Sequence, residues 1–236
     1  MKTTSIIVLA TGLALAGVSG AAAQTADPKA YVDVNIAGQL NSSTIVASSV
    51  FSLYGESGSA SSSQKVGNGI AFDLGVGYHV RKDLAIGAAV SLFTRAPAST
   101  VFVATPDPLA FNSFTTLAAS PQLTQTEEGT HIRVAYFRRV SDKIDVAISG
   151  GPSFMHLRKE IATVSVVNGT PQIAVVAQGA SAPGVNAGLE VNYLYTRRLS
   201  GSVFGRYVHA TVDLPAASGV RIGGLQAGVG LRLHVF

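Results

Sequence analysis

Hydrophobic and polar side chains alternate along most of the chain after residue 30. In residues 31–40, YVDVNIAGQL, Val32 and Val34 fall on one face and Asp33 and Asn35 on the other. A period of two is the pattern of a β-strand with one apolar and one polar face. Seven further segments alternate in the same way, and we predict a strand in each: residues 69–80, 84–92, 130–137, 144–154, 185–193, 199–208 and 225–236.

The connections between these strands are alternately short and long. Short turns are expected at residues 81–83, 138–143 and 195–198, and long loops at residues 41–66, 95–128 and 158–183, with an intermediate loop at 210–219. Short turns at one end and long loops at the other are typical of outer-membrane barrels. The fold class we predict is all-β, an eight-stranded antiparallel up-and-down transmembrane β-barrel. Within the third long loop, the Asn-Gly turn of VVNGTP predicts a hairpin that extends beyond the membrane.

A tyrosine followed by paired bases recurs where three strands enter the short turns. Tyr78, Tyr136 and Tyr193 lie on the apolar faces of their strands, and the bases follow within five residues. A tyrosine ring is apolar and its hydroxyl is polar, so it suits the boundary between hydrocarbon and water. We therefore predict an aromatic girdle on the periplasmic side, completed by Tyr31 and Phe236.

The composition shows that the chain is rich in apolar residues, although these do not form a membrane-spanning helix after the first 23 residues. Hydrophobic residues make up 47% of the chain and charged residues 13%, yet no run after the first 23 residues is long enough for a transmembrane helix. Residues 1–23 predict a secretory signal peptide, with Lys2, an apolar core and a small-residue cleavage site, which leaves residues 24–236 as one barrel domain. Cysteine is absent, so disulfides and thiolate chemistry are excluded.

The polar face of the strands carries charges of both signs. We predict a polar network in the lumen formed by Asp33, Asp73, Arg133, Glu190, Arg206 and Arg232. An eight-stranded barrel is only wide enough to be filled by its own side chains, so these charges must pair. Glu190 and Arg206 are expected to pair because they lie on adjacent strands. The favoured interpretation is a sealed, stabilising plug; the alternative is a gate that admits small solutes.

Three short motifs appear in the order expected of one barrel family: SGGPSF at residues 149–154, GRY at 205–207 and GLRL at 230–233. Over residues 30–236 the chain resembles the small eight-stranded outer-membrane barrels, the transmembrane domain of outer membrane protein A and the opacity-type proteins. The resemblance implies insertion by the outer-membrane assembly machinery, which in this family recognises a C-terminal strand ending in an aromatic. Here Phe236 shares the parity of Arg232 and His234, so either a bulge turns it outward or it lies at the periplasmic rim.

These observations favour an integral protein of the bacterial outer membrane. We expect a monomer that contacts outer-membrane lipids and has a structural or surface-interaction role through its long loops, without catalysis or a cofactor. No basic tract suggests nucleic acid, and the five histidines lack metal-site spacing. One alternative is a lipid A-modifying enzyme, because His209 precedes Thr211 and Asp213 in a faint likeness to a His-x-Ser motif. The other is a soluble, exported lipid-binding barrel.

Overall fold

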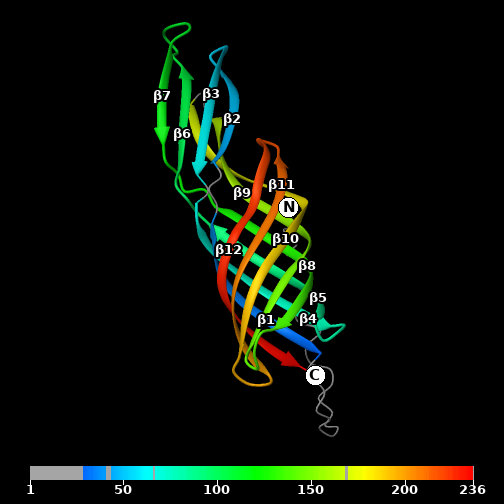
Figure 1. The fold of residues 1–236 in the computed structure, drawn as a ribbon. Coiled ribbons are helices and arrows are strands. Elements are labelled where there is room, and N and C mark those ends of the chain that lie inside the picture. Colours follow the sequence, from blue (N-terminus) through cyan, green and yellow to red (C-terminus); the bar gives the residue numbers. More distant parts are fainter. Residues whose placement is uncertain (1–28, 41–43, 66, 168–169, 236) are drawn as a thin grey trace.

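The computed structural model describes residues 29–40, 44–65, 67–167 and 170–235. The predicted signal peptide and Phe236 lie outside the described residues. Strands are the regular elements throughout the described ranges, and they form two sheets (Figure 1). No helix among the described residues is long and apolar enough to cross a membrane.

Eight strands form a closed antiparallel barrel in which chain neighbours pair with each other and the last strand closes on the first. Val34 of the first strand lies opposite Leu231 of the last. The predicted fold class is therefore confirmed. The barrel strands are β1 (Ala30–Leu40), β4 (Gly69–His79), β5 (Leu84–Arg95), β8 (Gln125–Arg139), β9 (Ile144–Val167), β10 (Thr170–Leu194), β11 (Leu199–Leu214) and β12 (Ala217–Val235).

A second sheet stands above the barrel, where we had predicted loops at residues 41–66 and 95–128. Its strands, in the order β2-β3-β6-β7, are β2 (Thr44–Leu53), β3 (Glu56–Lys65), β6 (Ser99–Pro106) and β7 (Phe114–Ala119). The prediction of loops was wrong here because these segments are rich in serine and glycine, which hide the alternation of apolar and polar positions. In β3 the buried positions are Gly58, Ala60, Ser62 and Gln64, which are too small or too polar to mark an apolar face in the sequence.

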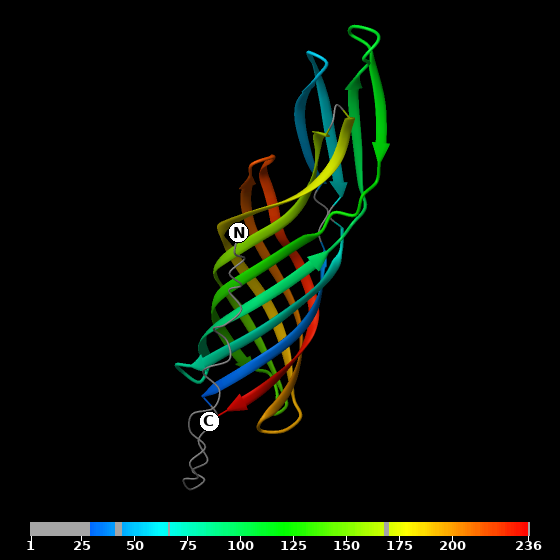
Figure 2. The ribbon, with the colours of Figure 1, turned by 180° about the vertical axis from the view of Figure 1, so that it is seen from behind.

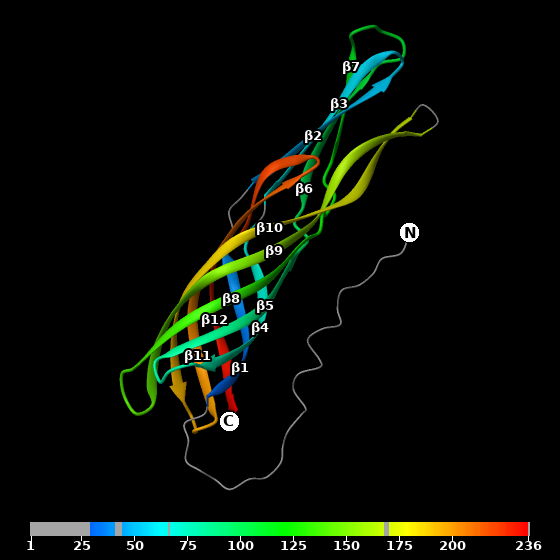
Figure 3. The ribbon, with the colours of Figure 1, turned by 90° about the vertical axis from the view of Figure 1, so that its right-hand side faces the viewer.

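The β9–β10 hairpin extends past the barrel rim beside the second sheet, as Figure 3 shows. Val167 pairs with Thr170 at its end, which confirms the predicted hairpin. Ala162 of the hairpin packs with Val101, Val103 and Ala60 of the second sheet, and these side chains are buried. The outward extension is therefore a packed structure with a core of its own, anchored on the longest barrel strands.

The barrel wall has its large apolar side chains on the outside and small or polar ones inside. Along β1, Val34 and Ile36 are exposed while Asp33 and Ala37 are buried. A continuous exposed apolar surface of this kind is unfavourable in water and is the surface that lipid covers. Ring closure also pairs the backbone groups of the wall, which an open sheet in hydrocarbon would leave unsatisfied. The fold is that of a transmembrane barrel.

The two ends of the barrel differ as the connection lengths predict. The β4–β5, β8–β9 and β10–β11 turns are short and gather at one end, which is the lower end in Figure 2. At the other end β9, β10, β11 and β12 continue beyond the wall, and the second sheet rises above them. The ends are called the turn end and the outer end below.

Candidate functional site

Three ion pairs fill the lumen near the turn end. The Arg232 guanidinium lies between two carboxylates, with Nε 2.6 Å from Asp33 Oδ1 and Nη2 2.9 Å from Glu190 Oε1. Arg133 Nη2 lies 3.6 Å from the second oxygen of Asp33. All four side chains point inward from different strands, so the pairs tie β1, β8, β10 and β12 together across the lumen.

The predicted pair between Glu190 and Arg206 is wrong. On the paired strands β10 and β11, Arg206 lies opposite Gly188, and Glu190 lies opposite Phe204. The guanidinium of Arg206 instead crosses the lumen, and its Nη1 lies 2.8 Å from Asp73 Oδ2. A long side chain in a narrow barrel thus finds its partner across the lumen instead of on the neighbouring strand.

A chain of hydrogen bonds through side-chain amides continues from the Arg206–Asp73 ion pair toward the outer end. Arg206 Nε and Nη2 both donate to Gln226 Oε1, at 2.9 and 2.7 Å. Gln226 donates to Gln39 at 2.6 Å, and Gln39 donates to Glu127 Oε2 at 3.1 Å. The backbone N–H of Gly223 also donates to that oxygen, at 2.8 Å. Hydrogen bonds therefore run without a break from Asp73 to the outer rim.

A histidine on β8 bridges two serines inside the wall. His131 Nε2 is 2.8 Å from Ser91 Oγ, and its Nδ1 is 2.8 Å from Ser153 Oγ. Asn186 Nδ2 donates to Ser153 Oγ at 2.9 Å. The arrangement resembles that of a serine activated by a histidine, and the His131 side chain is 0% exposed. We did not predict from the sequence the contacts of His131 with these two serines, which share the inward parity of the flanking strands.

The turn end of the lumen is closed by an aromatic floor, which consists of Tyr31, His79, Phe137 and His234. Tyr31 is 6% exposed, and the Arg232 guanidinium lies 4.3 Å from its ring centroid. The prediction that Tyr31 belongs to the outer girdle is therefore wrong. Tyr31 shares the inward parity of Asp33, and Gly77 opposite leaves room for its ring, because a Cβ at Gly77 would overlap it.

Three of the other predicted girdle residues lie on the outside of the barrel. Tyr78, Tyr136 and Tyr193 are 48%, 48% and 44% exposed, each near the start of a short turn. Phe236 lies outside the described residues. The three tyrosines therefore mark the edge of the apolar wall at the turn end.

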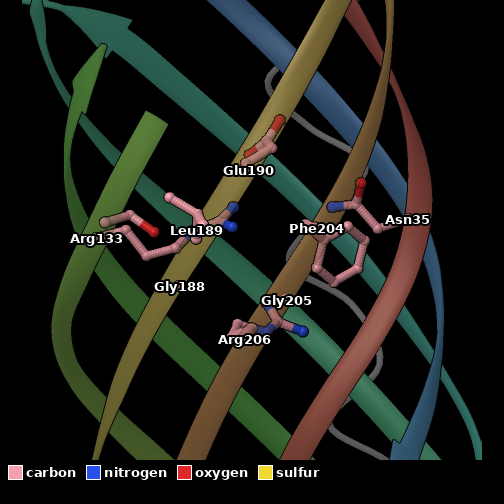
Figure 4. A pocket seen from close by; sticks show the side chains of 9 residues that line it. Asn35, Arg133, Gly188, Leu189, Glu190, Phe204, Gly205 and Arg206 are labelled. Atoms are coloured by element: carbon pink, nitrogen blue, oxygen red, sulfur yellow. The ribbon is translucent and has the colours of Figure 1, made fainter. Parts of the chain in front are cut away.

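A small cavity lies beside the ion pairs of the lumen. A cavity of about 20 Å³ lies among Asn35, Arg133, Glu190 and Arg206 (Figure 4). That volume accommodates roughly one water molecule. The charged side chains Asp33, Asp73, Arg206 and Arg232 are all nearly fully buried. Buried charges and ion pairs therefore cross the lumen at this level and leave room there for about one water molecule.

A lysine at the outer end has no ion-pair partner within the described residues. Lys159 lies on β9 five residues beyond Phe154, outside the lipid-facing wall, and its Nζ is buried without a hydrogen-bond partner. Burial lowers the pKa of Lys159 to about 8, although the nearby Glu127 carboxylate acts in the opposite direction. No group of three or more histidine, aspartate or glutamate side chains among the described residues could hold a metal ion.

The residues of the enzyme hypothesis are not assembled. His209 stacks on Tyr207 with ring centroids 6.1 Å apart. Asp213 Oδ1 accepts a hydrogen bond from the N–H of Gly219 at 2.7 Å. No hydrogen bond joins His209 to Thr211 or Asp213 in the part of the chain that the structure describes.

No family model and no curated protein matches the chain. Several solved structures are similar over most of their length. Neisserial surface protein A is 12% identical with a TM-score of 0.49, and 87% of this chain and 97% of that chain are covered. OprG from Pseudomonas aeruginosa is 10% identical, with a TM-score of 0.47 and coverage of 89% and 98%. The outer membrane protease OmpT from Escherichia coli is 10% identical, with a TM-score of 0.45 and coverage of 87% and 97%.

Proposed function

We propose that the protein is an integral outer-membrane barrel that serves as a sealed scaffold for a surface-exposed recognition sheet. The observation that carries this proposal is the contrast between the two parts of the molecule. The lumen is closed by ion pairs and by the aromatic floor, whereas the four-stranded sheet at the outer end presents an open face. The exposed face is therefore where a partner can bind.

The tip of the sheet has the features of a contact surface. Leu109 and Phe111, in the loop between β6 and β7, are 94% and 83% exposed. Asp107 accepts a hydrogen bond from the Leu109 N–H at 2.9 Å, and Glu56 accepts one from the Asn112 N–H at 3.1 Å. These bonds fix the loop and hold two large apolar side chains in solvent. Large exposed apolar side chains clustered on a rigid loop are characteristic of interaction sites.

The test compares binding by whole cells that display the wild type or a tip variant, Leu109→Ser with Phe111→Ser. Val175→Ser with Val176→Ser is the matched control, because both valines are exposed on the β9–β10 hairpin and not on the four-stranded sheet. Adhesion to host-cell monolayers and to extracellular matrix is measured, with heat-modifiable gel migration as proof of folding. We expect the tip variant to lose adhesion and the control to keep it. Equal adhesion by all three proteins, or adhesion no greater than that of cells without the protein, contradicts a recognition role.

The channel alternative is tested on the ion pairs. The cavity beside Glu190 and Arg206 holds about one water molecule. We therefore expect the refolded wild type to show no conductance in planar bilayers. Replacing Glu190 with alanine leaves Arg232 its bond to Asp33, so the plug is expected to stay closed.

The last strand, β12, closes the ring against β1 and is the segment that we propose the assembly machinery recognises.

A further inference from the structure

Bases gather at the turn end of the barrel. The turns and the adjoining strand ends carry eight exposed bases and two exposed acids, Asp83 and Asp142, with the half-buried Asp145 opposite Arg139. The outer end carries four bases and five acids outside the lumen, so positive charge is concentrated on one side of the membrane. We call the eight bases the basic collar: Lys29, Arg81, Lys82, Arg138, Arg139, Lys143, Arg197 and Arg198.

The three turns that carry most of the collar have the same backbone geometry. In each, one carbonyl that begins the next strand accepts two N–H groups from the turn, at 2.9 to 3.1 Å. The accepting carbonyls belong to Leu84, Ile144 and Leu199. The positions of the bases along each turn are therefore fixed by the hairpin and are not those of a floppy loop.

Neighbouring turns are also tied to one another around the rim. The Asp83 carbonyl accepts the N–H of Phe137 at 2.7 Å, and the Lys143 carbonyl accepts that of Leu194 at 2.8 Å. The Arg198 carbonyl accepts the N–H of His234 at 2.8 Å. These bonds join the β4–β5 turn to β8, the β8–β9 turn to β10 and the β10–β11 turn to β12. The collar is consequently a set of charges held at fixed points on a closed rim.

The collar bases form no ion pairs within the described ranges, where the four ion pairs all lie in the lumen. Paired bases follow within five residues of Tyr78, Tyr136 and Tyr193, which mark the edge of the apolar wall. This places the charged ends of long side chains at the depth of lipid headgroups, where arginine and lysine extend along the interface. Unpaired cations at that depth attract anionic headgroups.

We propose that the basic collar binds the phosphate groups of anionic phospholipids in the leaflet at the turn end. Arginine suits this role because its guanidinium forms two parallel hydrogen bonds with a phosphate, and five of the eight bases are arginine. The inference rests on the membrane embedding proposed above. It adds a lipid specificity, in which the barrel wall takes any acyl chain and the collar selects the headgroup.

The test measures lipid selectivity by electron spin resonance. The full protein is reconstituted in phosphatidylcholine vesicles that contain a trace of spin-labelled phosphatidylglycerol or spin-labelled phosphatidylcholine. A base near an anionic surface contributes about 1 kcal/mol, which is roughly a fivefold preference. The wild type is therefore expected to prefer phosphatidylglycerol about fivefold or more at low salt, and less at high salt because salt screens exposed charges.

A collar variant replaces the six bases of three paired sets with glutamine: Arg81→Gln, Lys82→Gln, Arg138→Gln, Arg139→Gln, Arg197→Gln and Arg198→Gln. The matched control removes three exposed bases from the outer end: Lys65→Gln, Arg158→Gln and Arg221→Gln. We expect the preference to vanish in the collar variant and to survive in the control. Because the collar side chains form no ion pairs within the described residues, both variants should show the heat-modifiable migration of a folded barrel.

Four results would overturn the proposal. The first is a wild type that inserts but shows no preference for phosphatidylglycerol. The second is a collar variant that keeps the preference, and the third is a control that loses it equally. The fourth is displacement of the spin-labelled lipid by inorganic phosphate at matched ionic strength, which would make the collar a site for free anions. A chain that fails to insert into vesicles at all contradicts the membrane embedding itself, and that failure is distinguished by extraction of the protein at alkaline pH.

Discussion

Replacing Arg232 with methionine tests whether the ion pairs hold the lumen together. The substitution removes the partner 2.6 Å from Asp33 and the partner 2.9 Å from Glu190, and it removes the cation above the Tyr31 ring. Asp33 keeps Arg133 at 3.6 Å, whereas Glu190 has no other ion pair in the described part of the chain. Removing one partner of a buried ion pair typically costs 3–5 kcal/mol, so we expect a loss of roughly that size.

The free energy of unfolding is measured by urea titration of the barrel in phospholipid vesicles, followed by far-ultraviolet circular dichroism. Arg221→Met on the same strand is the control, because Arg221 is exposed and should change stability by less than about 0.5 kcal/mol. Combining Arg232→Met with Glu190→Gln removes the one carboxylate left without an ion pair and should recover much of the loss. A loss below about 1 kcal/mol, or a double variant no more stable than the single one, refutes the reasoning.

Two further predictions concern single side chains. Burial lowers the pKa of Lys159 from its ordinary 10.5 to about 8. Between pH 8 and 10.5 the unfolded chain therefore binds more protons than the folded protein. The free energy of unfolding should rise with pH over this range, by about 1.4 kcal/mol per pH unit. Lys159→Met should abolish that rise and stabilise the barrel at pH 7, whereas the exposed neighbour Arg158→Met should not; a pH dependence equal in both proteins excludes Lys159 as its cause. Gly77→Ala places a Cβ against the Tyr31 ring and should cost about 1–3 kcal/mol, with part of the loss recovered by Tyr31→Ala, and denaturant titration of the single and double variants decides it.

The barrel could be predicted from the sequence because its wall obeys one rule over eight strands. Lipid on the outside demands an apolar residue at every second position, and residues such as Val34 and Ile36 show that period clearly. The second sheet obeys the same period, but its inner face is shared with the β9–β10 hairpin and needs only small residues such as Ala60. A strand of alternating serines carries too little hydrophobic contrast to be recognised without its partner.

The lumen residues could be listed from the sequence, but their pairing could not. Asp33 and Arg232 lie opposite each other on paired strands, which requires knowledge of the register between the first and last strands. Asp73 and Arg206 meet across the lumen, which requires the curvature of the closed ring. Tyr31 was misplaced because its type suits a girdle, while its parity, shared with Asp33, already placed it inside.

The central claim is that the barrel is a sealed scaffold in the membrane. The most direct test is single-channel recording of the refolded wild type in planar phospholipid bilayers, with insertion verified by heat-modifiable migration of the recovered protein. The packed lumen, with a cavity of about 20 Å³ beside Arg133, predicts a flat baseline at all voltages that the bilayer tolerates. Reproducible conductance steps from inserted protein would contradict the account, because ions would then be crossing a lumen that the ion pairs and the aromatic floor should close.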